Sequence, residues 1–373
     1  MATNTGMRAV SEAQLRAATE GGVPEPERIG AQWRGSTGSQ AESVGTELWS
    51  VAVPMPEAAS RGGAAGLGYT LSGILIAENG AVTVVDPGWE TPEAHAELDR
   101  MLAAQGRGIG DIAHIVVTHA HPDHVGAADA LRRISGAKLL MHEREQAGIE
   151  RVRASAVDGD GGGDPADFIS AWGVPGGQQE RLAEQLLRTR RSFGLPDPAE
   201  VLLRDGDRLP VEGAEWQALW TPGHTAGHLC LVDEERRLLF TGDHVLPTMF
   251  PGLGLGIDLG LRLPGESNPV ADHLASLERL RPYADYEVLP GHGYRFTGLT
   301  ARLDEMQDHI RTRAGEVGRA LAADPEATVW EIAPRLSWSA GWERLSASPM
   351  LASALLQTGY YAEFVRNGGL ESA

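Results

Sequence analysis

The chain has 373 residues, of which 42% are hydrophobic, enough for one large α/β domain and a smaller appended unit. Its net charge of −19 disfavours broad nucleic-acid binding, because an acidic surface repels polyanions at long range. The single cysteine, Cys230, excludes an internal disulfide, and no apolar run is long enough to span a bilayer. We therefore expect a soluble, cytoplasmic protein.

The first half of the chain reads as short strands and helices after a polar start. Residues 1–45 are rich in Gly, Ser, Glu and Gln and are expected to form a loose N-terminal arm. A domain over 46–298 then begins with a strand at 47–53. An Asn-Gly turn joins the apolar runs 66–77 and 81–85, which predicts a β-hairpin.

Helices and strands alternate after this hairpin, which is typical of an α/β layered fold. A helix is predicted over 91–105, a strand over 112–117, a helix over 125–134 and a strand over 137–141. Asp86 stands at the end of the hairpin, directly before Pro-Gly. A carboxylate at such a strand tip either supports a metal site from behind its ligands or is an ordinary turn aspartate.

The segment THAHPDH, residues 118–124, directly follows the strand at 112–117. Three histidines and one aspartate lie within six residues, and imidazole and carboxylate are ligands that zinc prefers. Proline in the middle stiffens the turn. We expect His119 and His121 to point to one site, and Asp123 and His124 to a neighbouring one.

Residues 143–200 interrupt the alternation and are expected to form a helical insertion, with two helices, that acts as a lid over a substrate. Phe168 and Trp172 are candidate substrate contacts there, or they merely cover the sheet. Arg191 belongs to a basic run that either meets an anionic substrate group or forms a solvated helix face. Phe250, in a later Gly/Pro-rich loop, is a further candidate contact.

A second run of strands is predicted from residue 201 onward, including one at 207–210, and a helix follows over 269–280. The motifs TPGHTAGH, TGDH and PGHG each follow an apolar strand, and they contribute His224, His228, Asp243, His244 and His292. Loops at one end of a sheet sandwich can bring these side chains to the histidine turn. His228 and His244 neighbour the other candidates, and we expect them to support the ligands, to line a substrate pocket or to form structural hydrogen bonds.

From residue 299 to 373 the pattern is helical and is similar to a small winged-helix-like domain. The part from Thr300 onward carries seven basic and ten acidic residues. Because a DNA-reading helix should be basic, we interpret this domain as a surface for packing or for forming a homodimer.

Over about residues 47–294 these motifs, in this order, resemble the metallo-β-lactamase superfamily. The resemblance implies an αββα sandwich, here with the helical insertion and the C-terminal helical domain, and a site for two divalent metal ions. Zn²⁺ is the expected metal, and iron or manganese occurs in relatives. The implied ligands are His119, His121 and His224 for metal 1, Asp123, His124 and His292 for metal 2, and Asp243 bridging both, with Asp86 in support.

The resemblance further implies a hydrolase in which a hydroxide held between the two metals attacks the substrate and Asp123 orients it as a catalytic carboxylate. True β-lactamases lack an aspartate at the position of Asp243, so antibiotic hydrolysis is not expected as the main activity. The motifs around His224 and Asp243 look like those of glyoxalase II and related hydrolases, and we predict a small-molecule thioester, ester or lactone as substrate.

Two alternatives remain open. The helical tail looks like that of the β-lactamase-like-2 group, which includes a single-strand endoribonuclease. A single-strand nuclease or phosphodiesterase is therefore the second functional hypothesis. The third is a non-catalytic metal-binding scaffold, which should have lost a ligand, and none is missing. The acidic charge makes a nucleic-acid partner the weaker expectation.

Overall fold

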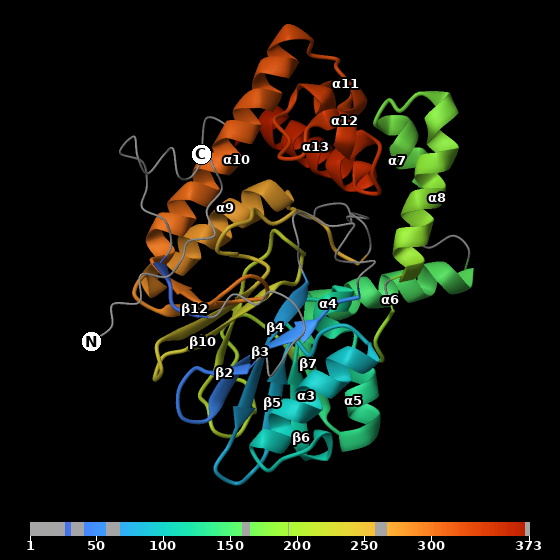
Figure 1. The fold of residues 1–373 in the computed structure, drawn as a ribbon. Coiled ribbons are helices and arrows are strands. Elements are labelled where there is room, and N and C mark those ends of the chain that lie inside the picture. The colour runs from blue at the N-terminus through green and yellow to red at the C-terminus, as the bar shows by residue number, and fades with distance from the viewer. Residues whose placement is uncertain are drawn as a thin grey trace.

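The computed structural model describes residues 27–30, 41–56, 68–158, 165–192, 194–257 and 267–369, and their strands form two mixed sheets (Figure 1). The first sheet has the order β2 (Ala41–Ser43), β3 (Leu48–Pro54), β4 (Tyr69–Ile76), β5 (Val82–Val85), β6 (Ile112–Val116), β7 (Lys138–His142), β8 (Val201–Leu203). The second has the order β1 (Glu27–Arg28), β13 (Phe296–Thr297), β12 (Glu287–Pro290), β11 (Leu238–Gly242), β10 (Leu229–Asp233), β9 (Gln217–Trp220).

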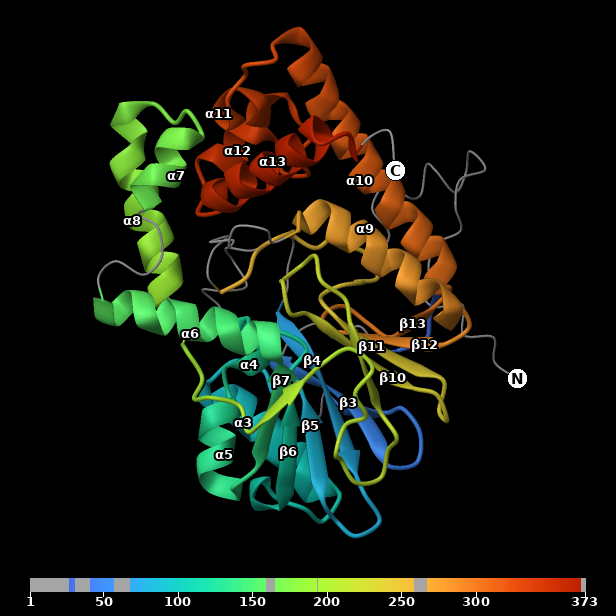
Figure 2. The same ribbon diagram turned by 180° about the vertical axis from the view of Figure 1, so that it is seen from behind.

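The two sheets pack face to face, and helices cover both outer faces. Leu48 and Leu140 of the first sheet share a buried cluster with Leu231 and Phe240 of the second. The first sheet buries its other face with α3 (Pro92–Ala104) and α5 (Ala128–Ser135), and the second with α9 (Pro269–Leu280) and α10 (Leu299–Ala323). These helix pairs lie on opposite sides of the molecule (Figure 2). The predicted αββα sandwich is confirmed.

Local sequence explains where several elements begin. In α3 the Thr91 side chain accepts a hydrogen bond from Ala94 N at 3.1 Å and Pro92 occupies the first turn, as helix N-termini favour. The hairpin of β4 and β5 is confirmed as an antiparallel pair. Its turn uses Gly80 at a φ of 90°, a value that glycine adopts without the steric cost of a Cβ atom.

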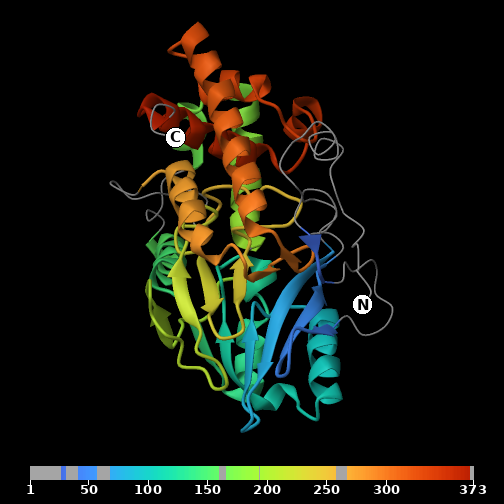
Figure 3. The ribbon, with the colours of Figure 1, turned by 90° about the vertical axis from the view of Figure 1, so that its left-hand side faces the viewer.

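The insertion is helical, as predicted, and consists of α6 (Glu143–Asp158), α7 (Pro165–Ala171) and α8 (Gly176–Ser192) rather than two helices. Ile169 and Leu182 of α7 and α8 share a buried cluster with Leu355 of α13 (Leu351–Arg366). Figures 1 and 2 show α7 and α8 beside the C-terminal helices, at one end of the molecule. Figure 3 shows α10 running from the sandwich up to that end.

Other expectations need correction or fall outside the described residues. The strand predicted at 207–210 is wrong, because only a single bridge joins Arg208 to Gln217 there. The helix predicted over 125–134 is present as α5 but begins at Ala128, and a separate short helix, α4 (Pro122–Val125), precedes it. Most of the arm at 1–45 lies outside the described residues, although β1 and β2 extend the edges of the two sheets.

The C-terminal region continues after α10 with α11 (Val329–Ile332), α12 (Trp342–Ser346) and α13. Between residues 299 and 369 the described chain contains no strand, and therefore no β wing. Among the helices within the described ranges, none combines the length and the apolar character needed to cross a bilayer.

Candidate metal centre

The predicted ligands all follow the ends of strands at one edge of the sandwich. The turn after β6 carries His119 and His121, and α4 begins immediately at Pro122 with His121 as its N-terminal cap. Asp123 and His124 lie within α4 itself, whereas His224, Asp243 and His292 follow β9, β11 and β12 of the other sheet. Because strand ends of both sheets meet at this edge, motifs far apart in sequence converge there.

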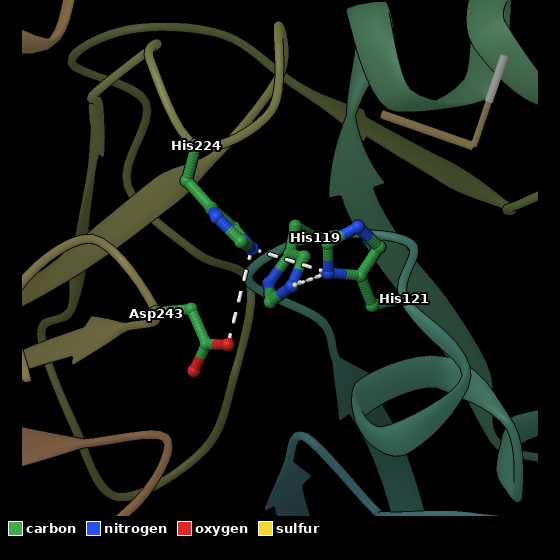
Figure 4. Close-up of side chains that lie close together, drawn as sticks. All are labelled: His119, His121, His224 and Asp243. Carbon is green, nitrogen blue, oxygen red and sulfur yellow. Dashed lines mark hydrogen bonds and ion pairs between the residues drawn. The ribbon is translucent and has the colours of Figure 1, made fainter. Parts of the chain in front are cut away.

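Three histidines and one aspartate form the first cluster (Figure 4). His121 Nδ1 lies 2.9 Å from His119 Nε2 and 3.1 Å from His224 Nε2. Asp243 Oδ2 lies 3.8 Å from His224 Nε2. All four ligand atoms lie within 4.8 Å of one another, an arrangement in which a divalent ion can be shared by three nitrogens and one oxygen.

The second cluster is built from Asp123, His124 and His292. Asp123 Oδ2 lies 3.2 Å from His292 Nε2 and 3.9 Å from His124 Nε2. Asp243 Oδ1 lies 3.4 Å from each of these two histidine nitrogens. The two oxygens of Asp243 therefore face different clusters, as a carboxylate that bridges two ions would.

The residues present fit divalent metal ions. Within the described structure, His124 Nε2, His292 Nε2 and Asp243 Oδ1 are buried, and the oxygen lies 3.4 Å from each nitrogen, yet none of them makes a well-aligned hydrogen bond. Burying such atoms without a partner is costly, so they point to a positively charged species between them. The arrangement of His and Asp side chains indicates divalent cations and leaves the choice of element open.

Asp86 holds the histidine turn in place. Its carboxylate accepts hydrogen bonds from Thr118 N (2.8 Å), Thr118 Oγ1 (2.8 Å) and His124 Nδ1 (2.9 Å). The Thr118 hydroxyl then accepts from His119 Nδ1 at 3.0 Å, which leaves His119 Nε2 for the first cluster. Asp86 adopts a φ of 50°, a strained value for a residue other than glycine, and these hydrogen bonds hold it in that conformation.

Glu145, at the start of α6, was not anticipated from the sequence. It is buried, and its carboxylate accepts hydrogen bonds from Ala120 N at 2.9 Å, Thr225 Oγ1 at 2.7 Å and Gly227 N at 2.8 Å. One side chain thus ties the histidine turn to the loop that carries His224. No motif surrounds Glu145, and its contacts come from residues 25 to 82 positions away, so only the folded structure identifies it.

His228 and His244 lie behind the first cluster and are fully buried. The His228 ring centroid is 5.3 Å from that of His119 and 5.4 Å from that of His244, which lies 4.2 Å from His273. Burial lowers the pKa of both His228 and His244 well below the usual value, so these rings are neutral. They pack the rear of the site and lie outside both ligand clusters.

The candidate substrate contacts are more scattered. Phe250 is 38% exposed and stacks on His309 with ring centroids 3.8 Å apart. Phe168 is half-buried, and Trp172 packs against the cluster shared by the insertion and the C-terminal helices. Arg191 lies in α8, and its side chain is outside the described residues. Substrate roles for these four residues stay predictions.

Charges in the site are strongly coupled to protons. Burial disfavours a charged His292, yet the attraction of Asp243 and Asp123 raises the pKa of His292 to about 10. Burial likewise opposes the shift of Asp123, but His124 and His292 lower the pKa of that carboxyl to about 2. Burial lowers the pKa of His224 to about 4. The second cluster therefore attracts positive charge, and in the first cluster His119 and His224 offer neutral imidazoles.

Comparisons with known proteins agree with this geometry. A model of the metallo-beta-lactamase superfamily matches residues 66–292, more than half of the chain. A probable metallo-hydrolase of Bacillus subtilis, YqjP, is 27% identical over 272 residues, covering 70% of this chain and 79% of its own.

Solved structures show the same relationship. A metallo-beta-lactamase family protein from Thermus thermophilus superposes with a TM-score of 0.68 at 27% identity, covering 87% of this chain and 94% of that one. A beta-lactamase domain protein from Burkholderia ambifaria has a TM-score of 0.66 at 22% identity, covering 90% and 92%, and shares the fold. The chain belongs to the metallo-beta-lactamase superfamily of metal-dependent hydrolases.

Proposed function

We propose that the chain is a hydrolase that holds two divalent ions, with zinc as the expected metal, and cleaves a small-molecule thioester, ester or lactone. The observation that carries the proposal is Asp243, whose two oxygens face two separate ligand clusters. His119, His121 and His224 would hold one ion, and Asp123, His124 and His292 the other. Such ions lower the pKa of water from ~15.7 toward ~7 and polarise the bond to be cleaved.

The protein side chains contribute orientation and charge. Asp123 has a pKa of about 2 and therefore stays ionised at neutral pH, so it can accept a hydrogen bond from the attacking water. In the first cluster, the neutral imidazoles of His119 and His224 present nitrogen lone pairs and no competing positive charge. The buried rings of His228 and His244 exclude water from the rear of the site.

The substrate class rests on charge and on the surroundings of the site. A net charge of −19 opposes the approach of a long polyanion, which favours a small acyl compound over RNA. Phe250, on the loop that follows Asp243, stacks on His309 and faces the Arg302 guanidinium, and the 38% of it that stays exposed is suited to an apolar acyl or alcohol group. Phe168, Trp172 and Arg191 are the other proposed contacts.

A substrate panel tests the proposal. The full chain is prepared metal-free, reloaded with zinc, manganese or iron, and offered acyl-thioesters, p-nitrophenyl esters, lactones, phosphodiesters and single-stranded RNA. Metal-dependent turnover of an ester, thioester or lactone is the expected result. Faster cleavage of RNA or of phosphodiesters would establish the alternative activity, and metal binding without any hydrolysis would contradict both and favour a scaffold.

A further inference from the structure

A short loop, residues 252–255, lies against the first ligand cluster. Gly252 O accepts a hydrogen bond from His224 Nδ1 at 2.7 Å, and Leu255 O accepts one from His121 Nε2 at 2.6 Å. A carbonyl oxygen can only accept, so both of these ring nitrogens carry the proton. The lone pairs are then on His224 Nε2 and His121 Nδ1, the atoms that face each other at 3.1 Å in the cluster.

The same loop is paired to the backbone around His224. Gly254 N donates to Gly223 O at 2.8 Å, and Leu255 N donates to His224 O at 2.9 Å. The loop and the His224 segment therefore form one unit. A shift of the loop would move both carbonyls that fix the histidine tautomers.

The opposite side of the loop is held by α13 of the C-terminal region. Gln357 Oε1 accepts a hydrogen bond from Leu253 N at 3.2 Å. The Tyr360 ring packs directly on Gly254, where an added Cβ would lie only 2.2 Å from Tyr360 Cε2. Gly254 also has a φ of +67°, so the tight contact uses a conformation that glycine adopts readily.

Helix α13 is itself a firm support. Leu355, Thr358 and Tyr361 are buried along it, and its two hydrophobic clusters join α10 on one side and the insertion helices on the other. The position of the loop is therefore set by a helix that begins almost 60 residues after the last predicted ligand, His292.

We propose that α13 is a functional part of the metal centre, with Gln357 and Tyr360 as positioning residues that hold loop 252–255 and thereby orient His121 and His224 for the first ion. This inference rests on the proposed two-ion function and extends it to the C-terminal helices. Groups that orient metal ligands typically change metal affinity about 10- to 100-fold when removed. Since Gln357 and Tyr360 act through a loop, we expect the lower end of that range.

The test uses the metal-free full chain and cobalt(II), whose visible absorption reports histidine ligation, with a competing chelator to measure affinity. Gln357→Leu removes the acceptor and should weaken the first cobalt ion about tenfold and alter its spectrum. Gln357→Glu keeps an acceptor oxygen and should restore both. Gln307→Leu is the control: Gln307 lies on α10, where it accepts a hydrogen bond from Arg281, and this variant should behave as the unmodified chain.

A second variant addresses the same loop from the other side. Gly254→Ala places a methyl group against the Tyr360 ring and should weaken cobalt in the same direction. Cobalt affinity and spectrum unchanged in both Gln357→Leu and Gly254→Ala would overturn the role of α13 while leaving the proposed function intact. An unmodified chain that binds no cobalt would instead overturn the proposed function, and this inference with it.

Discussion

Replacing Asp243 by asparagine removes one negative charge from the centre and keeps the shape of the side chain. Asp243 Oδ1 lies 3.4 Å from both His124 Nε2 and His292 Nε2. At an effective dielectric constant of ~20, a unit positive charge at such a distance is attracted by about 5 kcal/mol. Losing that attraction corresponds to a fall of about 10³-fold or more in cation affinity, since each 1.4 kcal/mol is about tenfold.

The assay for Asp243→Asn is metal content per chain after dialysis, followed by hydrolysis of the best ester or thioester substrate. We expect one bound ion or fewer and loss of activity. Asp285→Asn is the matched control, because the exposed Asp285 makes a surface ion pair with Arg237 and should leave metal content and activity unchanged. Two tightly bound ions and full activity in Asp243→Asn would refute the bridging role.

Three further predictions concern the surroundings of the ligands. Glu145→Gln turns an amide N–H toward backbone and hydroxyl donors, so zinc affinity should fall about 10- to 100-fold. Chelator competition measures this affinity, and an unchanged value would contradict the role of Glu145 in holding the histidine turn. Gly291→Ala places a Cβ 2.6 Å from Asp243 Oδ1 and should lower the zinc content. Gly110→Ala is the control, because its Cβ would meet open space. Equal zinc content in the two variants would contradict a clash with Asp243. The pKa of His292 is raised from 6.5 to about 10, so its proton stabilises the metal-free fold below about 6.5 and this stabilisation is lost as the pH rises through about 10. Because zinc must displace that proton, its affinity should increase between about pH 7 and pH 9, and a flat profile would contradict this coupling.

The sequence predicts much of the fold because its strands and turns are locally encoded. The Asn-Gly hairpin of β4 and β5 and the helix α9, which Asn268 caps and Pro269 begins, have the expected bounds within a few residues. The strand predicted at 207–210 is wrong because pairing with the β9 segment stops after one bridge, Arg208 to Gln217, and Pro210 has no N–H with which to continue a ladder. Whether a strand forms depends on hydrogen-bonded pairing with residues elsewhere in the chain, and a local sequence pattern does not reveal that pairing.

Much of the candidate site can also be predicted, because histidine and aspartate at strand ends are visible as residue types. The structure brings all seven predicted ligands into two clusters and places Asp86 beneath them. Glu145 could not be found, since an isolated glutamate on a helix has no distinctive spacing. The carbonyls of Gly252 and Leu255 could not be found either, because every residue has a backbone carbonyl and only the fold aims it.

The packing of the insertion against the C-terminal helices is equally hidden from sequence. The pattern indicates a helical insertion and a helical tail, but their shared buried cluster joins residues such as Leu182 and Leu355 that are far apart in the chain. The sequence favours a packing or dimerising surface for the tail. Its α13 contacts also reach the loop beside the first ligand cluster, through Gln357 and Tyr360.

The central claim is that Asp243 lies between two metal ions, and anomalous X-ray scattering tests it most directly. Crystals of the zinc-loaded chain, measured on both sides of the zinc absorption edge, should show two anomalous peaks. One peak is predicted among His119, His121 and His224, and the other among Asp123, His124 and His292, with Asp243 between them. A single peak, or none at these two clusters, would contradict a two-ion centre.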